Sequence, residues 1–195
     1  RNTGFLLVSD IGSRILSLIF LIYIARFLGD SGLGIYRFIF AYVGFFTLIS
    51  DLGIVPLIVR EVAKDKKKAA FYLHNSITLK IVFTLASLAV AVSILLSFER
   101  TPEMVIAVSV AAAAMLFYNL TEACLAIFQA HQKMEVSAFV VLIERLFTVG
   151  LGIFALFNGH GLLAIVWIYF IGYAVMFFST LFFAWRNFGR VRMSF

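Results

Sequence analysis

The chain has 195 residues, of which 63% are apolar and 13% are charged, and its formal net charge is +6. Soluble domains are about 45–50% apolar and about a quarter charged, and a soluble domain of this length cannot bury so much apolar surface. The composition therefore excludes an ordinary soluble protein and predicts an integral membrane protein.

Six apolar runs follow one another along the chain, and each is long enough for the ~20 residues that a spanning helix needs. The runs do not alternate with period two, so helices are expected and not the strands of a barrel. A tight turn at residues 29–32 joins the first two runs, and neither Pro56 nor Pro102 argues against the helices. The predicted helices cover residues 4–28, 34–59, 74–98, 104–130, 136–157 and 162–185. The expected fold is all-α, an integral membrane six-helix bundle that forms a single transmembrane lobe over residues 1–195.

The lysine and arginine residues of the short connections set the orientation of the bundle. One side carries ten of them, namely Arg1, Arg60, Lys64, Lys66, Lys67, Lys68, Lys133, Arg186, Arg190 and Arg192. The other side carries three, namely Arg26, Arg37 and Arg100. We therefore expect a multi-pass protein of the cell membrane, with both termini and the 60–73 connection in the cytoplasm. Because this asymmetry accounts for the net charge, the charge does not indicate binding to nucleic acid.

Several kinds of site are not indicated by the sequence. The single cysteine, Cys124, lies in the middle of a predicted helix, where a small packing residue is expected. His74, His131 and His160 are far apart and lack metal-binding spacing, and no glycine-rich loop joins a strand to a helix. We expect no enzyme activity, no metal and no cofactor. The start without Met and the end just after the sixth helix suggest one lobe of a longer transporter, with the C-terminal lobe absent from this chain.

Seven charged residues lie inside the apolar runs, where ionised groups cost at least ~2.5–3.5 kcal/mol each unless they face the bundle interior or a water-filled cavity. They are Asp10, Arg14, Asp51, Lys80, Glu122, Glu144 and Arg145. At a rise of about 1.5 Å per residue, they lie roughly 9–15 Å from the cytoplasmic ends of their helices. All seven are therefore expected in the cytoplasmic half of the membrane or at its midplane.

Two interpretations of this group remain open. In the first, the four acids and three bases form interhelical ion pairs, with Asp10 and Arg14 pairing along one helix face and Glu144 and Arg145 needing partners on two different helices. In the second, they line a cavity open to the cytoplasm, in which some bases bind an anionic substrate. Arg14 is the first candidate for substrate binding, because it is deepest and shares its face with two serines, and Arg145 is the second. Asp51 and Glu122 look more like polar groups of helix packing. Asp10, Asp51, Lys80, Glu122 and Glu144 are candidates for ion pairing or for coupling to a proton or sodium gradient.

Small and aromatic residues fit helix packing in a membrane. Gly44, the Ala111–Ala114 run and the Gly150-Leu151-Gly152 segment permit close approach of helices. Aromatic residues near helix ends, such as Tyr36 and Trp185, fit an interfacial belt.

The first 80 residues contain an ordered set of motifs. They are Ile24-Ala25-Arg26-Phe27-Leu28-Gly29, Gly32-Leu33-Gly34-Ile35-Tyr36, Ser50-Asp51-Leu52-Gly53-Ile54 and Val59-Arg60-Glu61-Val62-Ala63. In this order and at these separations, residues 2–80 resemble the N-terminal part of the oligosaccharide flippases of the polysaccharide-export family. That family belongs to the multidrug/oligosaccharidyl-lipid/polysaccharide exporter superfamily. Residues 81–195 add only the matching helix count, orientation and basic end.

The resemblance implies more than the composition does. Members of the family have 12 to 14 helices in two lobes that rock between inward-open and outward-open states. They move sugars linked to a lipid diphosphate across the membrane, for the biosynthesis of cell-surface polysaccharide. This chain would then be the N-terminal lobe, with the lipid-linked oligosaccharide, membrane lipids and a second lobe as its partners. A cationic cavity for the diphosphate would involve Arg14 and Arg145.

Other functions stay open beside this one. A cation-coupled multidrug exporter of the same superfamily would share the fold, and an anionic cavity would favour it. A non-transporting membrane scaffold is the plainest alternative. A glycosyltransferase or polymerase would need a long extracytoplasmic loop with paired carboxylates, and the loops here are too short.

Overall fold

The computed structural model describes residues 2–51, 53–97 and 101–188, and this part of the chain is helical apart from its short connections. The helices are α1 (Asn2–Asp51), α2 (Ile54–Lys64), the 3-10 helix η1 (Lys66–Lys68), α3 (Ala69–Ser97), α4 (Pro102–Ala130), α5 (Met134–Phe157) and α6 (Leu162–Phe188). The predicted all-α bundle is therefore confirmed. Arg1, Arg100, Arg190 and Arg192 of the predicted charge asymmetry, and the end of the helix predicted at 74–98, lie outside the described residues.

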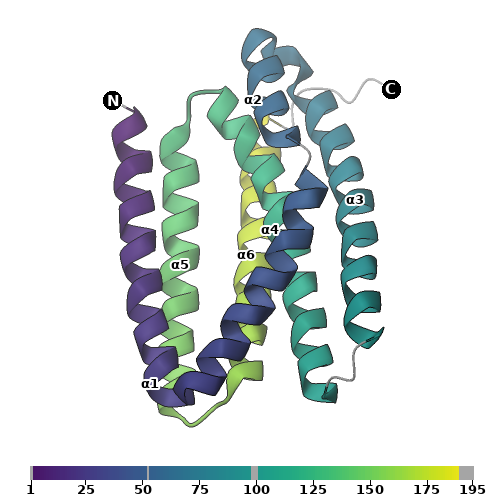
Figure 1. Ribbon diagram of the computed structural model, residues 1–195. Coiled ribbons are helices and arrows are strands. Elements are labelled where there is room, and N and C mark those ends of the chain that lie inside the picture. Colours follow the sequence, from purple (N-terminus) through teal and green to yellow (C-terminus); the bar gives the residue numbers. More distant parts are fainter. Residues whose placement is uncertain (1, 52, 98–100, 189–195) are drawn as a thin grey trace.

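Helix α1 contains the first two predicted spans, and a bend at Gly29 separates them. Gly29 has φ 69° and ψ −175°, a conformation that is open only to glycine without strain. The two legs run in opposite directions from this bend, so that α1 starts and ends at the same end of the bundle (Figure 1). The predicted turn at residues 29–32 is thus wrong in extent, because residues 30–32 are already helical. Gly32 is needed for a different reason, since a Cβ there would lie 2.5 Å from the Cβ of Leu28.

The helix predicted at residues 34–59 is divided in the structure. It ends at Asp51, and α2 begins at Ile54 after Gly53, which has φ 74° in the left-handed region. Pro56 accounts for the division, because it has no N–H to continue the hydrogen-bond ladder and is tolerated in the first turn of a new helix. Similarly, α3 begins at Ala69, five residues before the predicted start at residue 74. The predicted 60–73 connection is therefore largely helical.

In the part of the chain that the structure describes, five helices are long and apolar enough to cross a membrane, namely α1 (as Ser9–Leu48), α3, α4, α5 and α6. The α1 segment has 40 residues, which would reach about 60 Å if straight, twice the thickness of the hydrocarbon core. Because α1 bends back at Gly29, it supplies two crossings. The chain accordingly is a multi-pass membrane protein, and its described residues supply six crossings.

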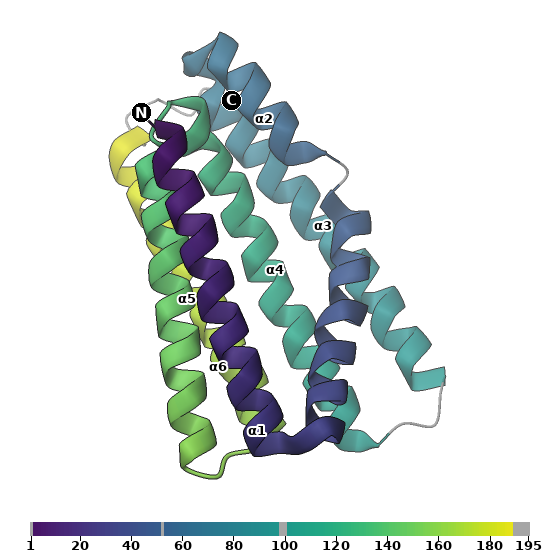
Figure 2. The same ribbon diagram turned by 60° about the vertical axis from the view of Figure 1, so that its left-hand side comes forward.

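Helix α4 lies at the centre of the bundle and packs against all the other α-helices (Figures 1 and 2). Its alanines make this possible, since Ala107, Ala111, Ala112 and Ala114 are buried where α4 meets its neighbours. The first leg of α1 packs mainly on α5, and its second leg on α3 and α4. The contact between the first leg of α1 and α5 requires a glycine at residue 152. A Cβ on Gly152 would overlap the ring of Phe20, which is 1% exposed. Gly150 and Gly44 have open space where a Cβ would be, so the predicted close approach holds for Gly152 alone among these three glycines.

Candidate functional site

The seven charged residues of the apolar runs divide into three groups in the structure. The first group is the Asp10–Arg14 pair on the first leg of α1. Arg14 Nε donates to Asp10 Oδ2 at 2.9 Å, so the predicted pair along one helix face forms. Its side chains are 76% and 59% exposed for Arg14 and Asp10, so the pair lies on the outside of the bundle and not in its interior.

The second group joins α1, α3 and α4. Lys80 Nζ donates to Asp51 Oδ1 at 2.6 Å, and the Lys80 side chain is only 1% exposed. Glu122 of α4 interacts electrostatically with both residues of this pair. One turn after Lys80 on α3, Thr84 accepts a hydrogen bond of 3.2 Å from Asn119 of α4. The interhelical ion pairing that was one of the two predictions is therefore present at Asp51 and Lys80.

The third group surrounds Glu144 and Arg145 of α5. Glu144 Oε1 accepts a hydrogen bond of 2.7 Å from Thr148, one turn along the same helix. Glu144 therefore has a hydrogen-bond partner on its own helix, and it also interacts electrostatically with Tyr118 of α4 and Tyr173 of α6. Gly172 of α6 presses against the Glu144–Thr148 pair, since a Cβ there would lie 2.7 Å from Thr148 Oγ1.

Arg145 faces tyrosines of other helices. It interacts electrostatically with Tyr36 of α1 and with Tyr169 and Tyr173 of α6, and its guanidinium is within hydrogen-bonding reach of the Tyr169 hydroxyl. Its Nε is buried and has no hydrogen-bond partner within the described part of the chain. Arg145 thus keeps an unused donor in a polar environment inside the bundle.

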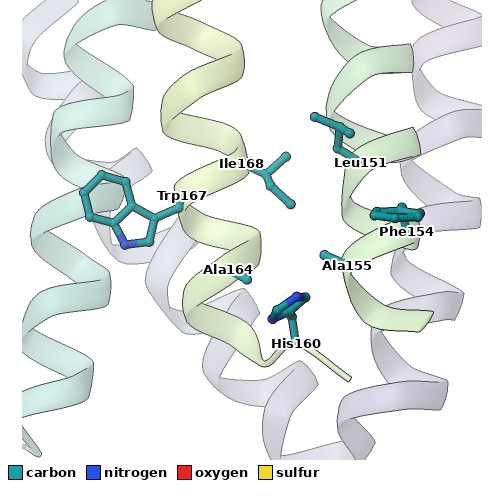
Figure 3. Close-up of a pocket in the computed structure, with 7 residues that line it drawn as sticks. All are labelled: Leu151, Phe154, Ala155, His160, Ala164, Trp167 and Ile168. Atoms are coloured by element: carbon teal, nitrogen blue, oxygen red, sulfur yellow. The ribbon is translucent and has the colours of Figure 1, made fainter. Parts of the chain in front are cut away.

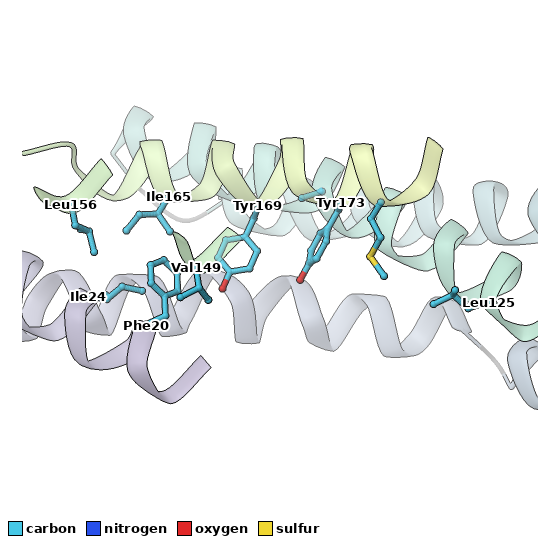
Figure 4. Packing of buried hydrophobic residues seen from close by; sticks show 10 residues of the cluster. Phe20, Ile24, Leu125, Val149, Leu156, Ile165, Tyr169 and Tyr173 are labelled. Carbon is cyan, nitrogen blue, oxygen red and sulfur yellow. The ribbon is translucent and has the colours of Figure 1, made fainter. Parts of the chain in front are cut away.

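Four tyrosines belong to the site, and the sequence analysis assigned none of them to it. The Tyr36 and Tyr169 hydroxyls lie 3.0 Å apart, so Tyr36 belongs to the interior and not to the interfacial belt predicted for it. Tyr169 and Tyr173 project side by side from α6 (Figure 4), and the ring of Tyr118 from α4 lies 5.2 Å from that of Tyr173. A spacing of four residues between Tyr169 and Tyr173 was the available signal, because it places both rings on one helix face.

The second and third groups are joined through Tyr118. Its side chain interacts with Glu122 by a hydrogen bond, and its electrostatic neighbours include Arg145 and Glu144. A row of polar groups therefore runs through the bundle from Lys80 to Tyr36. Guanidinium and phenol groups donate hydrogen bonds to phosphate oxygens and exchange them with sugar hydroxyls. The arrangement is suited to binding such groups.

A separate pocket of 310 Å³ lies between α5 and the start of α6 (Figure 3). Its lining is apolar apart from His160, and none of the seven charged residues contributes to it. The lining residues are Leu151, Phe154, Ala155, His160, Ala164, Trp167 and Ile168. This pocket suits a hydrocarbon chain and does not suit a diphosphate.

Metal binding has no support in the described residues, where no group of three or more His, Cys, Asp or Glu side chains could hold an ion. Cys124 is free and buried in α4.

Comparison with known proteins gives one match. A family model described as polysaccharide biosynthesis protein matches residues 1–195. No curated protein and no solved structure matches the chain.

Proposed function

The chain belongs to the polysaccharide biosynthesis protein family, and on this basis we propose that it is one lobe of a transporter that flips lipid-diphosphate-linked oligosaccharides across the cytoplasmic membrane. A second lobe completes the transporter, and rocking of the two lobes exposes the substrate first to the cytoplasm and then to the outside. The sugars and the diphosphate pass between the lobes, and the lipid tail stays in the bilayer. The protein performs no covalent chemistry in this scheme.

The exposed Asp10–Arg14 pair is the observation that carries the proposal. Both residues lie in an apolar spanning segment, and Arg14 is about 18 Å from the start of α1 at ~1.5 Å per residue. Charged side chains this exposed are costly against lipid, and they normally face water or protein partners. The first leg of α1 therefore borders a hydrated space, and we place the substrate path there.

A diphosphate–sugar group cannot cross hydrocarbon unaided, because charge and unpaired hydroxyls are both costly to bury. Arg14 supplies a guanidinium whose position is held by Asp10, and the incoming diphosphate competes with that carboxylate. Arg145, which is only partly buried, supplies a further donor near the middle of α5. Asp51, Lys80, Glu122 and Glu144 are mainly occupied with one another or with neighbouring hydroxyls, so we assign them to holding the helices together, with Glu122 and Glu144 as the candidates for ion coupling.

The test uses the full-length protein with Arg14→Gln, Arg145→Gln and the control Arg37→Gln. Arg37 is also an exposed arginine of α1 but lies near the bend, outside the proposed path. Glycan export in cells, the amount of protein in the membrane and binding of lipid-linked oligosaccharide to the purified protein are measured together. We expect Arg14→Gln and Arg145→Gln to lose export and binding at normal protein levels, and Arg37→Gln to retain both.

The alternatives give different results. Normal glycan export by both variants would overturn the substrate role of the two arginines. Loss of organic-cation efflux with intact glycan export would assign the protein to multidrug export. Deletion without any transport defect would favour a membrane scaffold.

A further inference from the structure

The segment from α2 to η1 carries a concentration of positive charge at one end of the bundle. Residues 60–68 contain five basic and two acidic residues, a net charge of +3 over nine positions. The side chains of Arg60, Lys64 and Lys68 are 68%, 63% and 61% exposed, and Lys66 is also exposed. We call Arg60, Lys64, Lys66 and Lys68 the α2 basic surface.

The orientation of α2 keeps these charges outward. Its inner face, formed by Ile54, Ile58 and Val62, is buried against Ala126 and Ile127 of α4. Figure 2 shows α2 lying at the end of the bundle beside α3 and α4, and α3 enters its apolar span at Ala69, directly after η1. At 11 residues α2 is too short to cross a membrane. It is an amphipathic helix packed on the end of the spanning helices.

The acidic residues of the segment organise the charges without neutralising them. Glu61 Oε1 accepts hydrogen bonds of 2.9 Å from both Arg60 and Lys64, which holds these two side chains together. Arginine has five N–H donors and lysine three, so donors remain for an outside anion. Apolar side chains flank the basic surface, since Leu57 is 45% and Phe71 65% exposed.

We propose that the α2 basic surface binds the headgroups of anionic phospholipids, while Leu57 and Phe71 contact the acyl chains below them. The anionic leaflet attracts clustered lysines and arginines within a Debye length of about 10 Å. An amphipathic helix at the end of the spanning helices, with basic residues beside exposed apolar ones, matches such a leaflet. Orientation of the chain during insertion requires only the charges themselves, and it requires neither the packed amphipathic helix nor the flanking apolar side chains. This inference is independent of the proposed transport.

The test compares the full-length protein with Lys64→Gln/Lys66→Gln/Lys68→Gln and with Arg26→Gln/Arg37→Gln. The second variant removes exposed basic residues from α1 on either side of its bend and is the matched control. Each purified protein receives equal amounts of phosphatidylglycerol and phosphatidylcholine, and the retained lipids are counted by native mass spectrometry. The wild type and the control should prefer phosphatidylglycerol, and each removed lysine should reduce that preference by up to about fivefold.

Additional variants and a competing anion test the same proposal. The variant Lys64→Arg/Lys66→Arg/Lys68→Arg should keep the preference for phosphatidylglycerol, because the charge is kept. An unchanged melting temperature of the glutamine variant shows that this variant folds. An excess of inorganic pyrophosphate should leave the phosphatidylglycerol bound; displacement would assign the surface to free phosphates and overturn the proposal. Equal retention of the two lipids by the wild type, or an equal loss in the control variant, would also overturn it.

Discussion

The ammonium nitrogen of Lys80 lies 2.6 Å from a carboxylate oxygen of Asp51, and this contact ties the end of α1 to α3. Lys80 is 1% exposed and Asp51 35%, so the lysine has no access to water while the carboxylate keeps some. Asp51 is also the last residue of α1 before the chain turns at Gly53 into α2. The pair therefore fixes the position at which the second leg of α1 ends.

We expect Lys80→Met to lower the free energy of unfolding by about 1–3 kcal/mol, because the partly buried carboxylates of Asp51 and Glu122 lose their counter-ion. Asp51→Asn in the same chain should restore part of the loss, since it removes one uncompensated charge. Thermal unfolding in detergent of the two single variants and the double variant measures the coupling, which should reach about 0.5–3 kcal/mol. Additive costs would show that the pair does not interact.

Gly152→Ala should lower the free energy of unfolding by about 1–3 kcal/mol, because the new methyl group overlaps the buried ring of Phe20. Gly150→Ala is the matched control on the same helix, since its methyl group enters open space. It should be neutral or stabilise α5 by up to about 1 kcal/mol. Melting temperatures of the two variants in the same detergent compare them directly, and equal shifts would contradict the close contact between α1 and α5.

Tyr36→Phe should cost about 0.5–1.5 kcal/mol, because the Tyr169 hydroxyl loses a partner 3.0 Å away. Tyr169→Phe should cost more, since that hydroxyl is also within reach of the Arg145 guanidinium. The double variant should cost less than the sum, and unfolding of all three proteins tests this. If Tyr36→Phe were the more damaging of the two, Arg145 would not depend on Tyr169.

Hydrogen bonds from Lys64 and Arg60 lower the pKa of the Glu61 carboxyl below its ordinary value of 4.5. A carboxyl with a lowered pKa in the folded state stabilises the protein above its unfolded pKa, and this contribution is lost as the pH falls through the folded pKa. The wild type should therefore be more stable than Glu61→Gln near pH 7, and the difference should shrink as the pH falls below the unfolded pKa of about 4.3 and disappear below the lower folded pKa. Unfolding measured across pH 3–7 tests this, with Arg60→Gln/Lys64→Gln as the background in which the difference should be absent.

The apolar runs predicted the helices, because each run is long enough to be stable as a helix only in lipid. The ends of the helices were harder to predict where a single residue determines them. Residues 30–32 include Asp, Ser and Gly, which favour turns in water, yet the conformation of Gly29 alone reverses the chain. Pro56 was expected to lie within the helix predicted at residues 34–59, near its end, whereas its lack of an N–H suits the start of a new helix.

The candidate site was predicted in its charges but not in its contacts. The sequence identifies Lys80 and Asp51 as costly residues in a membrane, but their pairing depends on how α1 and α3 are rotated about their axes. Arg145 was predicted to need a partner on another helix, and the rotation of α6 supplies tyrosines there. Aromatic residues are too frequent in this chain for any four of them to stand out by composition.

The bend at Gly29 leaves no spare chain between the two legs of α1. One inserted residue would turn the second leg by about 100° around its axis. Tyr36 would then move away from Tyr169, and Asp51 from Lys80. The connections after Ser97 and Phe157 lie between helices that end and restart separately, so an extra residue there shifts no contact inside a helix. Length changes across relatives should therefore be found in those connections and be absent from the ten residues on either side of Gly29, which behave as a fixed-length unit.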